Sequence, residues 1–149
     1  MSVEEVINMD SILESIKKLL GIAEEDTDFN TDIVIHINSV LMILNQLGIG
    51  PSDGFWIKDN SAVWKDFVGD DKSIEAVKSY VYLKVRLLFD PPLSSAVTDA
   101  INKNISELEW RLKVIAENKA STNSQYCRIK MEVKNCRLMN GLLLVLLLL

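Results

Sequence analysis

The apolar residues of the chain fall into four segments, each with the three-to-four-residue spacing of an amphipathic helix. The first segment is SILESIKKLLG, residues 11–21. Its apolar residues share one helical face: Ile12, Leu13, Ile16, Leu19 and Leu20. Ser11 and Glu14 have the spacing of a capping box, and Gly21 suits the left-handed residue that closes a helix. We therefore expect a short helix here, followed by an acidic linker over residues 24–28.

The second segment, residues 30–47, has an unusually wide apolar face. The face comprises Ile33, Val34, Ile37, Val40, Leu41, Leu44 and Leu47, and it is widened by Ile35 and Ile43. So wide a face predicts a helix that is buried on more than one side. His36 lies within it and is interpreted as structural, because the sequence offers it no second metal ligand or catalytic partner.

The third segment, residues 71–89, predicts the central helix of the fold. Its apolar residues are Ile74, Val77, Tyr80, Val81, Leu83, Val85, Leu87 and Leu88. A strand over YVYLKVRLLF is the competing interpretation, and we reject it because the helical stripe continues unbroken from Ile74. Proline has no amide hydrogen and disfavours helical geometry in the residue before it. Pro91 and Pro92 should therefore push Asp90 out of the α region and end the helix at Phe89, which makes a rigid corner.

The fourth segment, residues 95–118, predicts a helix that starts from Ser94 or Ser95. Its inward residues are Val97, Ile101, Ile105, Leu108, Leu112 and Ile115. Its outer face carries three acid–base pairs at i, i+4 spacing: Asp99–Lys103, Glu107–Arg111 and Glu109–Lys113. Trp110 lies nearly opposite the inward stripe, among Lys103, Ser106 and Lys113. Two interpretations stay open: Trp110 anchors an interaction with a partner, or a neighbouring segment of the chain covers it.

The segment between the second and third helices, residues 48–71, is irregular and rich in aromatic residues. Within it, FWI can form a short strand and SAVWKDFV can form two turns of helix. We favour a satellite cluster in which Trp56, Trp64 and Phe67 pack on the helices, because a monomer seldom leaves large aromatic surfaces exposed. The alternative is that Trp56 and Trp64 are exposed binding residues.

The character of the sequence changes at residue 120, so we expect a domain over residues 1–119 and an atypical tail over 120–149. ASTNSQ is interpreted as a linker. The closing run, residues 142–149, would span about 12 Å as a helix, well short of the ~30 Å hydrocarbon core of a membrane. The tail is interpreted as an extra packing helix, an association segment or the product of a shifted reading frame. Cys127 and Cys136 are expected to be free thiols in a reducing cytosol.

Charge and motif content narrow the range of functions. Residues 1–119 carry 12 basic and 20 acidic residues, a net charge of −8, whereas residues 120–149 carry 4 and 1, a net charge of +3. An acidic body disfavours nonspecific nucleic-acid binding, which depends on Lys and Arg displacing phosphate counterions. The sequence contains no GxSxG, CxxC, HExxH or phosphate-binding loop, so we expect no enzyme, no cofactor and no metal site. From the residues alone, the chain is expected to be an all-α protein, a small bundle of about four main helices with an irregular Trp-containing middle segment.

Four segments of the chain, in this order, resemble a family of head–tail connector proteins of tailed phages and prophages. They are MDSILESIKKLLGI, TDIVIHINSVLMILNQLGIGP, VKSYVYLKVRLLFDPP and ISELEWRL. The resemblance covers about residues 9–116, and LLFDPP followed by ISELEWRL is its most specific part. Members of this family are described as connector, adaptor, head-completion or DNA-packaging proteins.

The resemblance implies a structural role in the virion. It implies a ring of copies that follows the portal's symmetry, binds the portal protein and presents a docking surface for a stopper or tail-completion protein. DNA would be cargo in the channel, and no membrane would be involved. The location would be the head–tail junction, after a period in the host bacterial cytoplasm. The candidate interaction residues are Trp110, Lys103, Lys113, Trp56 and Trp64, and the structural corner is Phe89, Asp90, Pro91 and Pro92. A small phage regulatory or adaptor protein that binds DNA is the alternative.

Overall fold

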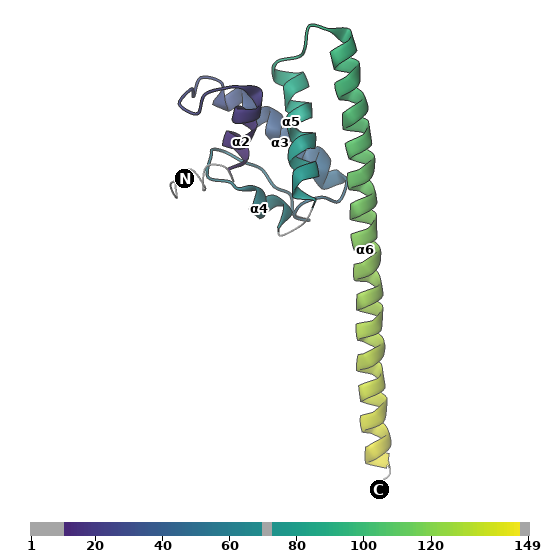
Figure 1. Cartoon of the computed structure of the whole chain (residues 1–149). Coiled ribbons are helices and arrows are strands. Elements are labelled where there is room, and N and C mark those ends of the chain that lie inside the picture. The colour runs from purple at the N-terminus through teal and green to yellow at the C-terminus, as the bar shows by residue number, and fades with distance from the viewer. Residues whose placement is uncertain (1–10, 70–72, 147–149) are drawn as a thin grey trace. The chain divides into compact units, whose positions relative to one another are not determined.

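The computed structural model describes residues 11–69 and 73–146, with side chains as far as residue 122 (Figure 1). Its helices are α2 (Ile12–Leu20), α3 (Asn30–Gln46), α4 (Trp64–Val68), α5 (Ile74–Phe89) and α6 (Ser95–Leu146). The expected all-helical class is confirmed. No strand occurs in the part of the chain that the structure describes, where Ser11 and Val63 form an isolated antiparallel bridge. The short strand expected for FWI is therefore wrong.

The first helix begins and ends as its sequence predicts. The Ser11 side chain accepts a hydrogen bond from the Glu14 N–H at 3.4 Å. Gly21 has the left-handed conformation, with φ of 80°. At that end the Gly21 N–H donates to the Lys18 carbonyl at 3.2 Å and the Ile22 N–H donates to the Lys17 carbonyl at 3.0 Å. This pair of bonds is a Schellman motif, so α2 is closed at both ends by its own sequence.

The core lies where α5 packs against α2 and α3. It includes fully buried apolar side chains from all three helices: Ile12, Ile16, Ile33, Ile37, Leu41, Leu44, Val77, Val81 and Val85. The wide face of α3 is only partly used, because Ile35 is 57% exposed and Met42 is 58% exposed. The expectation that this helix is buried on more than one side is therefore wrong at Ile35, the one of these two residues that belonged to the expected face. On α5, Leu88 also stays exposed.

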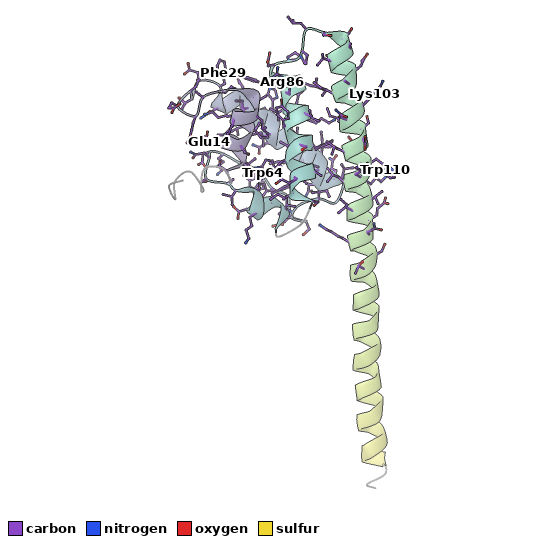
Figure 2. The ribbon with its side chains drawn as sticks, viewed as in Figure 1. Glu14, Phe29, Trp64, Arg86, Lys103 and Trp110 are labelled. Atoms are coloured by element: carbon purple, nitrogen blue, oxygen red, sulfur yellow. The ribbon has the colours of Figure 1, made fainter. Side chains whose placement is uncertain are left out.

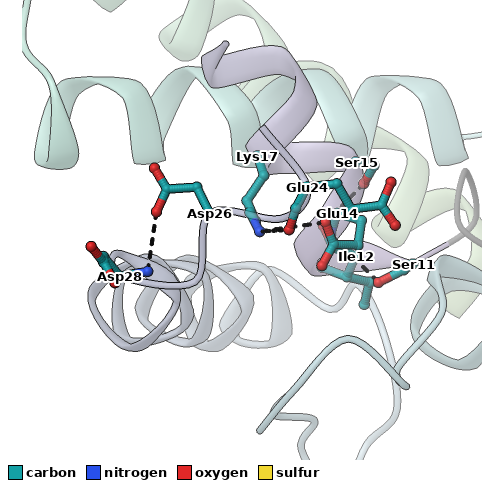
Figure 3. Close-up of polar contacts among 8 residues, drawn as sticks. All are labelled: Ser11, Ile12, Glu14, Ser15, Lys17, Glu24, Asp26 and Asp28. Carbon is teal, nitrogen blue, oxygen red and sulfur yellow. Dashed lines mark hydrogen bonds and ion pairs between the residues drawn. The ribbon is translucent and has the colours of Figure 1, made fainter. Parts of the chain in front are cut away.

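One charged pair is buried beside this core and holds the acidic linker (Figure 3). Lys17 is 1% exposed, and its Nζ donates to the Glu24 carbonyl at 2.9 Å and lies 3.6 Å from Glu14 Oε2. A buried ammonium is stable only when hydrogen bonds and an opposite charge replace its water. Within the same linker, Asp26 Oδ1 accepts the Asp28 N–H at 3.1 Å. The linker is therefore ordered by local bonds and by a buried cation.

The corner after α5 has the geometry that its prolines predict. The helix ends at Phe89, and Asp90 leaves the helical region with φ of −140° and ψ of 76°. Arg86 Nη2 lies 3.2 Å from Asp90 Oδ2, and the Phe89 ring meets the Phe29 ring edge-on at 5.6 Å. The Ser94 carbonyl then accepts the Thr98 N–H at 3.0 Å, which sets the start of α6.

Helix α6 does not end near residue 118. It continues through the residues interpreted as a linker to Leu146, so the expected helix end is wrong. The reason lies in Ser121 and Thr122, whose hydroxyls donate to the carbonyls of Glu117 and Asn118, each at 2.9 Å, and so fit inside a helix. The chain divides into two compact units, Met1–Val114 and Ile115–Leu149. The division at residue 119 expected from composition stays a prediction.

Candidate interaction surfaces

The aromatic middle segment is divided between the core and the surface. Trp64, at the start of α4, is fully buried, and its indole Nε1 donates to Ser15 Oγ at 2.8 Å. Phe67 is also buried, with its ring 5.4 Å from that of Phe55. Trp56, in contrast, is 66% exposed. The favoured satellite cluster is therefore correct for Trp64 and Phe67 and wrong for Trp56, and Trp64 has no surface to offer a partner.

Two asparagines of α3 fasten the preceding part of this segment along the helix. Asn38 makes a pair of bonds with Ile57: its Oδ1 accepts the Ile57 N–H at 2.7 Å, and its Nδ2 donates to the Ile57 carbonyl at 2.8 Å. One heptad further along, Asn45 Nδ2 donates to the Pro51 carbonyl. The asparagine side chains thus give the loop backbone the partners that a neighbouring strand would supply. The Asn38 pair fixes the position of Trp56, the residue before Ile57.

A groove opens between the start of α3 and the continuation of this loop. Its volume is about 300 Å³, and its lining combines apolar side chains with polar ones: Leu13, Asn30, Thr31, Val34, Ile35, Lys58, Asp59 and Asn60. We call this feature the α3 groove. Asp59 lies on its rim, and its Oδ1 accepts both the N–H of Ser61, at 2.9 Å, and the hydroxyl of Ser61. These bonds lower the pKa of the Asp59 carboxyl, which is therefore ionised at neutral pH and lies next to the basic residue Lys58 of the same lining.

The wall of the groove also contains an unmet acceptor. The Oδ1 atom of Asn30 is buried and has no hydrogen-bond partner among the described residues. A buried polar atom in a native protein normally has a partner, which is often water or a bound molecule. The α3 groove is therefore a depression of mixed apolar and polar lining, with one buried acceptor that has no partner among the described residues.

The second surface is the outer face of α6. Trp110 is 64% exposed and lies on the side of the helix opposite Ile105 and Leu112, which are buried (Figure 2). Lys103 and Lys113, seven residues before and three after Trp110, are also exposed. We call these three residues the Trp110 face. None of the described residues covers the Trp110 indole, so the structure favours the interpretation of an exposed interaction residue over that of a side chain covered by a neighbouring segment.

The inner side of α6 is joined to α5 by a polar contact. The Tyr80 hydroxyl donates to Glu109 Oε2 at 3.0 Å. Burial raises the pKa of Tyr80 well above its usual value, and the bond to Glu109 raises it further. Of the three acid–base pairs expected on α6, Glu107–Arg111 forms at 2.7 Å, whereas Glu109 is engaged by Tyr80. No ion pair joins Asp99 to Lys103 or Glu109 to Lys113 in the portion with described side chains.

Sequence reasoning identified Trp110 and Trp56 but missed the α3 groove and the two asparagines that shape it. One available signal was the pair Asn38 and Asn45, two asparagines seven residues apart in a helix with a wide apolar face. Neither a metal-type cluster of His, Cys, Asp and Glu nor a helix long and apolar enough to cross a membrane is found among the described residues.

The described part of the chain is all-helical and carries two exposed features, the α3 groove and the Trp110 face. A family model described as phage connector protein matches residues 12–119, and the chain belongs to this family of structural proteins. The resemblance noted in the sequence is thereby confirmed. No curated protein and no solved structure matches the chain.

Proposed function

We propose that this protein is a head–tail connector that binds the portal protein and extends the DNA channel toward a stopper or tail-completion protein. The observation that carries the proposal is the family match over residues 12–119, which includes the whole of the core and both candidate surfaces. In this role the protein acts as a ring of copies at the head–tail junction of the virion. Before assembly it resides in the host bacterial cytoplasm.

The charge of the body supports this function. Residues 1–119 carry a net charge of −8. A channel wall that binds DNA strongly would retain it, because each Lys or Arg that neutralises a phosphate adds favourable counterion release. An acidic wall lets DNA pass without holding it. DNA is then cargo in the channel and not a bound partner.

The exposed aromatic residues support a role in protein assembly. Trp110 and Trp56 are each about two-thirds exposed, at 64% and 66%. Tryptophan is enriched among the residues that dominate interface energies, since burying an indole removes a large apolar area from water. Together with Lys103 and Lys113, these residues form the set through which the connector contacts its neighbours or the portal.

Co-assembly with the portal protein tests this proposal. The full chain is purified, mixed with the portal of the same phage, and examined by sedimentation velocity and negative-stain electron microscopy. We expect the chain to co-sediment with the portal and to add ring-shaped density at one end of it. A chain that stays monomeric at high concentration and does not sediment with the portal would contradict the proposal.

A further inference from the structure

We infer that the Trp110 face of one copy docks into the α3 groove of a second copy, with the indole of Trp110 inserted into the groove. This inference rests on the proposed function and names the surfaces through which copies join. The argument has three parts: the fit of the indole, the charges around it, and the positions of the two surfaces on one molecule.

The groove suits an indole in both size and chemistry. Its volume of about 300 Å³ is sufficient for a tryptophan side chain, and Leu13, Val34 and Ile35 give it apolar walls. The indole N–H needs an acceptor once it leaves water. Thr31 and Asn60 are exposed residues of the lining, and each has a side-chain oxygen that can accept this bond.

The charges on the two surfaces are complementary. Lys103 and Lys113 flank Trp110, and no partner for either is found among the described side chains. Asp59, on the groove rim, uses Oδ1 for both of its bonds to Ser61, which leaves Oδ2 open to a cation. A lysine beside an inserted Trp110 can bond this Oδ2, in competition with Lys58, which belongs to the same lining and acts electrostatically on Asp59. Complementary charges of this kind fix the orientation of docking and suppress wrong partners.

The two surfaces lie on different elements of one compact unit and stay open together. Trp110 faces away from the buried side of α6 (Figure 2), whereas the groove is formed by residues of α2 and α3 and by residues 58–60. One molecule thus presents both an indole and a groove. A contact that joins different surfaces of two copies leaves one of each surface free, so it continues to a third copy and closes into a ring when the rotation allows.

Two single-surface variants of the full chain test the pairing. Trp110→Ala removes the inserted group and keeps the groove, and Ile35→Arg adds a cation to the groove wall and keeps Trp110. Both residues are more than half exposed, so helical content and urea midpoint should match the parent. We expect each variant alone to weaken self-association at least about tenfold by sedimentation equilibrium, because a central tryptophan dominates an interface. Met42→Ala is the matched control, since it truncates an apolar side chain that is 58% exposed on α3 and lies outside the groove lining, and it should assemble like the parent.

Mixing the two variants gives the decisive result. The Trp110→Ala chain still has its groove and the Ile35→Arg chain still has its indole, so an equimolar mixture should form heterodimers that cannot grow further. A mixture that stays monomeric, or Trp110→Ala copies that assemble as the parent does, would overturn the pairing. If Trp110→Ala copies assemble as the parent does, and the parent forms rings and binds the portal, the proposed function remains intact although the pairing is overturned. A parent that neither self-associates nor joins the portal would instead reject the proposed function.

Discussion

The pair of hydrogen bonds between Asn38 and Ile57 gives the sharpest test of how the middle segment is held. Asn38→Ala removes an N–H···O bond of 2.7 Å and another of 2.8 Å, and it leaves the Ile57 backbone groups unpaired beside a side chain that is 2% exposed. Each lost bond costs about 1 kcal/mol, and an unpaired buried group raises the cost to about 1–3 kcal/mol. The gain from replacing asparagine by alanine in a helix is about 0.5 kcal/mol. Two bonds at about 1 kcal/mol each, less this gain, give an expected net loss of unfolding free energy of at least about 1.5 kcal/mol.

Urea denaturation, followed by circular dichroism and tryptophan fluorescence, measures this loss. With a slope of about 1–3 kcal/mol per molar urea, the midpoint should fall by at least roughly 0.5 M. Asn104→Ala is the matched control, because Asn104 lies exposed on α6 and the same substitution there should stabilise the chain by about 0.5 kcal/mol or less. If Asn38→Ala unfolds within about 0.5 kcal/mol of Asn104→Ala, the two bonds do not hold the loop and the argument is refuted.

Three further predictions concern the glycines, the tyrosine and the corner. Gly50→Ala should lower the free energy of unfolding, measured in urea, by about 1–3 kcal/mol more than Gly54→Ala does. Both glycines have positive φ, but a Cβ at Gly50 would also overlap the Phe67 ring. Equal losses in the two variants would count against this reasoning. The pKa of Tyr80 is raised in the folded state, so the unfolding free energy should fall as the pH rises above ~10, the pKa of tyrosine in the unfolded chain. In unfolding free energies measured from about pH 8 to 11, Tyr80→Phe should remove this fall. A fall that is unchanged in the variant would exclude Tyr80 as its source. Pro91→Gly should weaken assembly, measured by sedimentation, more than it lowers the urea midpoint; a parallel fall of both would make the corner a folding element only.

The helices were predictable because their signals are local. The signals for α2 lie within eleven consecutive residues: the apolar stripe, the N-cap Ser11 and the C-terminal Gly21. The corner after α5 follows from Pro91 and Pro92 alone. The end of α6 was missed for the opposite reason. Ser121 and Thr122 favour turns by composition, but their hydroxyls bond back to the preceding helical turn once the helix is in place.

The surfaces were harder to predict, since they depend on residues distant in sequence. Trp110 could be placed on an exposed face because a helix of known phase fixes the direction of every side chain. The sequence could not tell which of Trp56 and Trp64 is buried, because both lie in an irregular segment without a period. That difference depends on contacts with distant residues, such as the bond between Trp64 and Ser15 and the bonds between Asn38 and Ile57, the residue after Trp56. The α3 groove combines residues from α2, α3 and the loop, a combination that no local pattern records.

The buried ammonium of Lys17 makes this residue an internal chemical probe. An amine-reactive reagent can reach Lys17 only when the Glu24 carbonyl and the Glu14 carboxylate release it, whereas Lys18, its neighbour in sequence, is exposed at all times. The ratio of the two labelling rates, read by mass spectrometry, therefore reports the fraction of time for which the linker between α2 and α3 is detached. Because that linker leads directly into the α3 groove, slower labelling of Lys17 in assembled protein would register occupancy of the groove without any substitution in the chain.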